Sequence, residues 1–264
     1  MDNVEQTQSG PSPLFDIHCH CGLAVEGEVP AQPGERELIA TAAVCHWQEL
    51  LPHLDGARHR FGAVGLHPWY AEQWDGARAE QLEMLLTCTE IRAVGEVGLD
   101  PAATVSMAVQ EQVLRAQIRI ALKVGKPLIL HVSKGYPDIL KILKEERAER
   151  VGGVVHGFST GANIGEAFIR QGFYLGIGPL LLRENVRKLP EALRHLPAEY
   201  LVLETDAQGG RGGYATPKQR TAILATIAHR LAELHVTTEA QMCTQLWRNS
   251  CDLLQFNSPK EIDR

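Results

Sequence analysis

The sequence has no apolar run long enough to cross a bilayer, and its N-terminus has no hydrophobic stretch of the secretory type. Cysteines are few, six in 264 residues, so we expect reduced thiols and no disulfide framework. Basic residues are not in excess, because 26 Lys and Arg oppose 32 Asp and Glu. We therefore expect a soluble, cytoplasmic protein without membrane contact. Any contact with nucleic acid should be local, since no broad basic surface is available.

The sequence also lacks internal repeats, low-complexity tracts and any linker that would divide it. A chain of this length can form one α/β barrel with a sizeable core, so we predict a single domain over residues 14–256. The polar segment 1–13 is predicted to be a flexible N-terminal arm, and residues 257–264 a short C-terminal tail.

Eight short aliphatic or β-branched runs alternate with segments long enough to hold a helix, which is typical of a parallel sheet built from βα units. Eight such repeats predict a closed (β/α)8 TIM barrel. The clearest helical pattern covers 105–123, and two more helices are expected near the C-terminus, the second closing the bottom or side of the barrel. The runs lie at residues 14–17, 38–44, 61–66, 91–97, 128–132, 153–156, 173–177 and 200–204.

Ionisable side chains recur where these runs end. On a strand, successive side chains point to opposite faces, so His18 and His20 should project together while Cys19 and Cys21 project the other way. Because barrel active sites gather at the carboxyl ends of the strands, we expect the ionisable residues of the eight runs to converge. Those that follow the first pair are His67, Glu96, His131, His156 and Asp206.

Four of these five imidazoles together with the two carboxylates already exceed what one four-coordinate ion needs, and they favour a pair of metal ions with a bridging carboxylate. A zinc site that includes the thiolates of Cys19 and Cys21 is the alternative. Strand alternation argues against it, because both thiols should face the helix layer as small buried groups.

Several ordered motifs run nearly from end to end of the chain. They are Phe15-Asp16-Ile17-His18-Cys19-His20, Gly65-Leu66-His67-Pro68, Gly95-Glu96-Val97-Gly98-Leu99-Asp100, Gln110, Gln117 and Ala121 before Pro127-Leu128-Ile129-Leu130-His131, His156-Gly157-Phe158-Ser159-Thr160-Gly161, Leu203-Glu204-Thr205-Asp206-Ala207, and Arg248-Asn249. In this order they resemble the TatD-related metal-dependent deoxyribonucleases of the amidohydrolase superfamily.

The resemblance implies two divalent ions, of zinc, manganese, magnesium, iron or cobalt, with Glu96 as the bridge between them. Asp206 and Glu96 would be the catalytic residues, because Asp206, or a hydroxide shared by the ions, would activate the attacking water. The implied ligands are His18, His20, Glu96 and Asp206 for one ion, and Glu96, His131 and His156 for the other.

For His67 the resemblance implies a contact with substrate phosphate or a proton-transfer role, and capping of the loop before Pro68 is the structural alternative. Trp69 follows directly, and either stacking on a base or packing at the rim would suit it.

The chain also departs from the family pattern. Ser133 stands where the family usually has an arginine, so a two-pronged grip on phosphate is missing and Lys134 could replace it only as a point charge. Pro101 replaces the usual aromatic after Asp100, and the glycine-rich segment 207–213, which we predict to be mobile, replaces the family's proline and bulky residues.

From these patterns we expect a hydrolase that cleaves phosphodiester bonds from DNA ends with metal-activated water. The alternative keeps the same barrel and metals but hydrolyses a small cyclic amide, lactone or phosphate ester. A third hypothesis is a catalytically weak barrel that binds or assembles with a partner, although the sequence identifies no protein partner.

Overall fold

The computed structural model describes residues 13–20, 35–54, 59–207 and 216–256. Residues 1–12 of the predicted arm, the predicted tail, Cys21 and most of the segment 207–213 therefore lie outside the described residues. Within them, no helix is long and apolar enough to cross a membrane.

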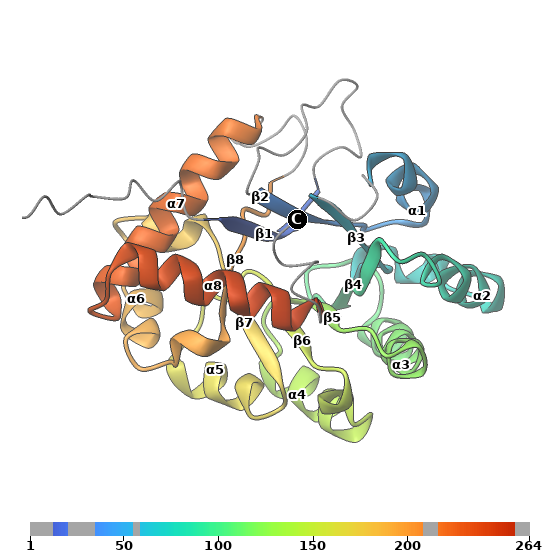
Figure 1. The fold of residues 1–264 in the computed structure, drawn as a ribbon. Coiled ribbons are helices and arrows are strands. Elements are labelled where there is room, and N and C mark those ends of the chain that lie inside the picture. Colours follow the sequence, from blue (N-terminus) through green and yellow to red (C-terminus); the bar gives the residue numbers. More distant parts are fainter. Residues whose placement is uncertain (1–12, 21–34, 55–58, 208–215, 257–264) are drawn as a thin grey trace, which may run out of the picture.

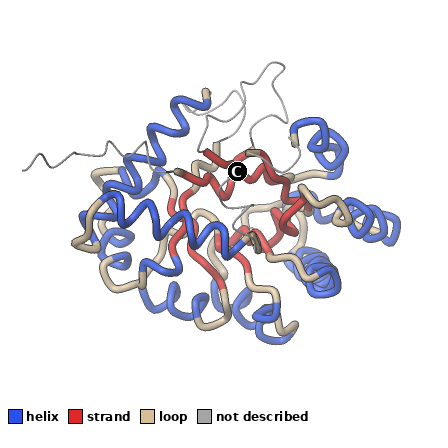
Figure 2. Tube along the Cα trace, viewed as in Figure 1, coloured by secondary structure: helices blue, strands red, loops and turns tan. Residues whose placement is uncertain are grey.

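Eight strands form one parallel sheet in the order β1 to β8, and the helices lie around it (Figures 1 and 2). Backbone bonds join the last strand end to the first, because the amide of His20 donates to the carbonyl of Ala207 at 2.7 Å and that of Asp206 to the carbonyl of His18 at 2.9 Å. The predicted (β/α)8 barrel is confirmed. The strands are β1 (Leu14–Cys19), β2 (Glu35–Ala40), β3 (Arg60–Val64), β4 (Ile91–Leu99), β5 (Leu128–Val132), β6 (Gly153–Val155), β7 (Phe173–Ile177) and β8 (Leu201–Leu203).

The helical layer follows the strands in sequence. Its α-helices are α1 (Val44–Leu50), α2 (Gly76–Leu85), α3 (Met107–Val124), α4 (Tyr136–Glu145), α5 (Ala162–Ile169), α6 (Lys188–Leu193), α7 (Pro217–Leu234) and α8 (Glu239–Leu253). Short 3₁₀ turns lie between them, η1 (Leu51–His53), η2 (Pro68–Gln73), η3 (Ala148–Arg150), η4 (Pro179–Leu182) and η5 (Ala198–Tyr200).

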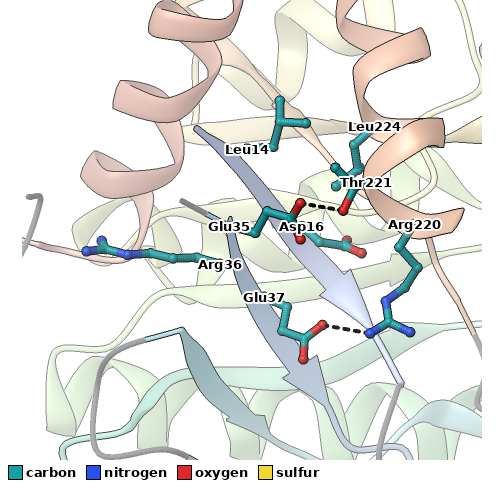
Figure 3. Close-up of a pocket in the computed structure, with 8 residues that line it drawn as sticks. All are labelled: Leu14, Asp16, Glu35, Arg36, Glu37, Arg220, Thr221 and Leu224. Atoms are coloured by element: carbon teal, nitrogen blue, oxygen red, sulfur yellow. Dashed lines mark hydrogen bonds and ion pairs between the residues drawn. The ribbon is translucent and has the colours of Figure 1, made fainter. Parts of the chain in front are cut away.

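The second strand begins earlier than the predicted run at 38–44 and ends at Ala40. Its first half is charged, so no apolar run marks the start of this strand in the sequence. Glu37 accepts from the guanidinium of Arg60 at 2.6 Å. It also pairs with Arg220 of α7 at 3.2 Å, as Figure 3 shows. Buried carboxylates of this kind are tolerated when they are paired and hydrogen-bonded.

The barrel interior is a separate apolar cluster formed by alternate residues of the strands, including Phe15, Ile17 and Phe61. The last residue of α8 and the residues after it join this cluster through Leu253, Leu254 and Phe256. Because Phe15 and Phe61 lie near the amino ends of their strands, α8 closes the bottom of the barrel, as the sequence predicted. The opposite, carboxyl end is left for the polar side chains.

Two β-bulges change which residues face the interior. Along β1, Asp16 pairs with Glu37 but Cys19 pairs with Ile39, so β1 advances three residues while β2 advances two. The same offset separates Val94 from Val97 in β4. An extra residue reverses the alternation of side chains, and bulges of this kind re-aim side chains beside active sites. As a result His18 and Glu96 face inward, while their apolar neighbours remain buried.

Candidate metal centre

The carboxylate of Glu96 lies at the centre of the polar cluster, and its two oxygens face different sets of histidines. Oε2 lies 3.8 Å from Nε2 of His18 and 3.5 Å from Nε2 of His20. Asp206 approaches from the end of β8, with Oδ1 3.5 Å from His18 Nε2 and 3.7 Å from His20 Nε2. Two imidazole nitrogens and two carboxylate oxygens therefore lie close together at this end of the barrel.

The other oxygen, Glu96 Oε1, faces the histidines of the neighbouring strands. It lies 2.8 Å from Nδ1 of His131 and 2.7 Å from Nε2 of His156. Those two nitrogens are 3.1 Å apart, and His67 Nε2 lies 3.6 Å from the same oxygen. The two oxygens of a single carboxylate thus face two different groups of ligand-type atoms.

Hydrogen bonds outside the cluster turn particular ring nitrogens inward. His20 Nδ1 lies 2.8 Å from the carbonyl of Ala40, which can only accept, so the proton is on Nδ1 and the lone pair of Nε2 points to the centre. His131 Nε2 lies 3.3 Å from Oδ2 of Asp100, which places Nδ1 toward Glu96. Carbonyl and carboxylate partners of this kind orient the histidines of metal sites.

Because the cluster is buried, some of its side chains lack the polar partners they need when no ion is bound. His18 is fully buried, neither ring nitrogen has a hydrogen-bond partner, and burial lowers its pKa to about 4. Burial also opposes the charge of His156, but the charge and hydrogen bond of Glu96 outweigh it and raise the pKa of His156 to about 10. Unpartnered buried nitrogens beside carboxylates fit a bound cation, which would satisfy both. Among the described residues, three sets of side chains each bring their ligand-type atoms within 4.8 Å of one another: His18, His20 and Glu96; His18, His156 and Asp206; and His67, Glu96 and His131.

The remaining predicted residues have different environments. His67 does cap the loop before Pro68, because its Nδ1 accepts from the backbone amide of Trp69 at 3.1 Å. Ser133 continues the pairing of β5 with β4, and Lys134 is exposed with a φ of 58°. Among the described contacts, none that joins the cluster involves Lys134. Cys19 is buried and packs in the apolar cluster between strands and helices, as alternation predicted.

Two glutamines of α3 have a role that the sequence did not reveal. The amide of Gln117 accepts from the backbone N–H of Leu66 at 2.7 Å and donates to its carbonyl at 3.1 Å. Gln110 does the same for Asp100, at 2.8 and 3.0 Å. Both lie on the apolar face of α3. The sequence could have indicated their role through this position, because a buried amide needs a hydrogen-bond partner.

Two further carboxylates of this region were not assigned from the sequence. Asp16 accepts from the backbone amide of Thr205 at 2.9 Å and from its hydroxyl at 2.5 Å, so it ties β1 to the end of β8. Glu204 is buried and accepts from the amide of Gly157 at 2.6 Å, and burial raises its pKa to about 8. A Cβ on Gly176 would lie 2.1 Å from Glu204 Oε2, so glycine leaves room for this carboxylate.

Comparison with known proteins identifies a family and related metal-dependent hydrolases. The model of the family described as TatD related DNase matches residues 15–255. The metal-dependent hydrolase YabD of Bacillus subtilis strain 168 is 29% identical over 262 residues, covering 92% of this chain and 100% of that protein. The 3'-5' ssDNA/RNA exonuclease TatD of Edwardsiella piscicida is 36% identical over 150 residues, covering 56% of this chain and 57% of that protein.

A solved structure supports the same fold. The crystal structure of YjjV, a TatD homologue from Escherichia coli K12, superposes with a TM-score of 0.78 at 24% identity, covering 91% of this chain and 97% of that chain. The family match spans nearly the whole domain, and the polar cluster lies where a metal-dependent barrel hydrolase carries its site. The chain therefore belongs to the TatD related DNase family of metal-dependent hydrolases.

Proposed function

We propose that this protein is a two-metal phosphodiesterase that removes nucleotides from DNA ends. The observation that carries the proposal is that the two carboxylate oxygens of Glu96 face separate sets of histidines. The exonuclease name of the Edwardsiella relative supports nucleic acid as the substrate. The proposed ligands are His18, His20, Glu96 Oε2 and Asp206 for one ion, and Glu96 Oε1, His131 and His156 for the other.

Divalent ions in these positions would supply Lewis acidity, lower the pKa of a bound water and stabilise charge on the phosphate. Asp206 is suited to take the proton of the attacking water. Its side chain is 46% exposed, so it faces both the centre and the solvent. Burial disfavours its charge, but its close contact with His18 and the nearby imidazoles of His156 and His20 outweigh this and lower its pKa, so the carboxylate is ionised and able to accept a proton.

His67 is proposed to donate a hydrogen bond to a phosphate oxygen. Since its Nδ1 accepts from the amide of Trp69, the proton of the neutral ring is on Nε2. This nitrogen lies 3.6 Å from Glu96 Oε1 and so points at the centre. Burial lowers the pKa of His67 to about 4, which keeps the ring neutral near pH 7. A donor at this position would stabilise negative charge on the substrate. Binding of a metal ion through His67 Nε2 would instead require removal of the proton from that nitrogen.

Substrate binding beyond the metals is proposed to rest on Lys134, as a point charge at the end of β5. Ser133 is the specific observation that favours a second candidate function, hydrolysis of a small cyclic amide, lactone or phosphate ester, because serine cannot grip phosphate as arginine does.

The proposal is tested by metal analysis together with an activity panel. We expect close to two divalent ions per chain, and faster hydrolysis of single-stranded DNA than of RNA, small esters or cyclic amides. Glu96→Gln should lower metal content and reduce hydrolysis by more than about 100-fold, since even partners of metal ligands contribute about 10- to 100-fold. Glu80→Gln, at an exposed position of α2, is the matched control. Full metal and full activity in Glu96→Gln would refute the bridging role.

A further inference from the structure

Trp69 is the one exposed tryptophan of the four in this chain, with 55% of its surface accessible. Trp47 is fully buried, and Trp74 and Trp247 are partly buried against apolar clusters. A single exposed aromatic is ordinary on a protein surface. Trp69 differs from that ordinary case because both ends of the residue are held by groups of the metal centre.

The indole and the backbone of Trp69 make separate hydrogen bonds. Its Nε1–H donates to Oδ2 of Asp100 at 2.6 Å, and its backbone N–H donates to Nδ1 of His67 at 3.1 Å. The ring packs edge to face with the imidazole of His67, with centroids 5.6 Å apart and planes at 84°. An aromatic ring fixed in this way loses little side-chain entropy when a flat ligand stacks on it.

The anchor of the indole also belongs to the surroundings of the centre. Asp100 is buried, its Oδ1 accepts from the amide of Ala102 at 2.9 Å, and its Oδ2 lies 3.3 Å from His131 Nε2. Asp100 and His67 thus hold Trp69 next to the side of the cluster where His67 and His131 face Glu96 Oε1. A ligand on the exposed indole would therefore be a neighbour of a phosphate bound at the centre.

The charge of the chain favours a nucleobase as that ligand. With a net charge of −6, few phosphate contacts are available, so affinity for a nucleic acid must come largely from other interactions. Stacking of a base on an aromatic ring is such an interaction, and it needs no particular base because every base has a π-face. In a duplex the paired bases are already stacked on one another, so an unpaired base fits this site.

We propose that Trp69 is a stacking platform for the unpaired terminal nucleobase of the strand whose phosphate the centre binds. This inference rests on the proposed nuclease function and adds the feature of the substrate that the site recognises. The preference is for single-stranded ends carrying a base, irrespective of its identity.

The experiment compares two oligonucleotides that differ only in their terminal residues, which carry bases in one and are abasic in the other. For the wild-type protein we expect kcat/KM, and affinity in a fluorescence anisotropy assay, to favour the base-carrying strand by about 5- to 150-fold. That range corresponds to about 1–3 kcal/mol per stacked base. Metal content is measured in every variant.

Trp69→Phe and Trp69→Leu both remove the indole N–H from Asp100, so their comparison isolates the aromatic face. We expect Trp69→Phe to retain most of the preference and Trp69→Leu to reduce it to about one, with equal metal content in both variants. Hydrolysis of both strands by the wild type at equal rates, or a preference that survives in Trp69→Leu, would overturn the platform and leave the nuclease proposal standing. If neither strand were hydrolysed but binding still favoured the base-carrying strand in a way that depends on Trp69, the nuclease proposal would be refuted and the stacking platform would stand.

Discussion

Replacing Gln117 by methionine tests how the strand end that carries His67 is held. Gln117 is fully buried in α3, and its amide satisfies both backbone groups of Leu66, which directly precedes His67. Methionine has a similar length and fills the same space, so the substitution leaves little cavity but removes both hydrogen bonds.

The expected cost follows from the two groups left unpaired. Leu66 is buried, so neither its N–H nor its carbonyl can turn to water instead. An unsatisfied buried donor or acceptor costs about 1–3 kcal/mol, which makes the loss about 2–6 kcal/mol for the pair. A typical domain is stable by about 5–15 kcal/mol, so the variant should fold only marginally or need low temperature.

The assay is urea unfolding followed by circular dichroism, carried out with a chelator so that metal binding does not add to the stability. Gln112→Met is the matched control, because Gln112 is exposed on the same helix and its change should stay within about 0.5 kcal/mol. If Gln117→Met unfolded at the same urea concentration as Gln112→Met, the role assigned to Gln117 would be wrong.

Three further predictions concern the centre itself. Asp100→Asn should weaken the affinity for one of two ions by about 10- to 100-fold in a metal titration, because it removes the charge that orients His131, and unchanged affinity would contradict that role. Ser133→Arg should raise kcat/KM on DNA by about 10- to 100-fold, from about 1.5–3 kcal/mol per charge-assisted bond, and Lys134→Ala should lower it with metal content unchanged. If neither variant alters DNA hydrolysis, the small-molecule alternative is favoured. The raised pKa of His156, about 10, means that its ring is protonated at neutral pH and must lose a proton to bind metal, so affinity should rise with pH by up to about tenfold per unit toward pH 10. Calorimetry in buffers of different ionisation enthalpy would show this proton release, and its absence would contradict the assignment.

Local patterns in the sequence were sufficient for the barrel. The runs at 128–132 and 173–177 coincide with β5 and β7, because burial on both faces leaves continuous aliphatic stretches that can be recognised without knowing the partners. The second strand was placed too late, since its charged start is buried only by pairing with Arg60 and Arg220. The predicted strand boundary was therefore wrong where the burial of a charged side chain depends on a distant residue and not on the local sequence.

The polar cluster, too, was predicted from the local sequence in part and decided by contacts between strands in part. The sequence could show that His18, His20 and Glu96 lie at or near the carboxyl ends of strands, which a barrel brings together. That both His18 and the preceding Ile17 face inward required the bulge between β1 and β2. A bulge depends on the register with another strand, so no pattern within one strand predicts it.

The sequence by itself determined the fold and the side-chain types of the polar cluster, because these follow from local periodicity and from the residues near strand ends, and its ordered motifs indicated the family. Only the tertiary structure decided which oxygen of Glu96 faces which histidines and which backbone the amide of Gln117 holds, 51 residues away in the chain. It also decided that Trp69 is anchored at both ends and open to solvent. These features are contacts between segments far apart in sequence, and their geometry exists only once the barrel has closed.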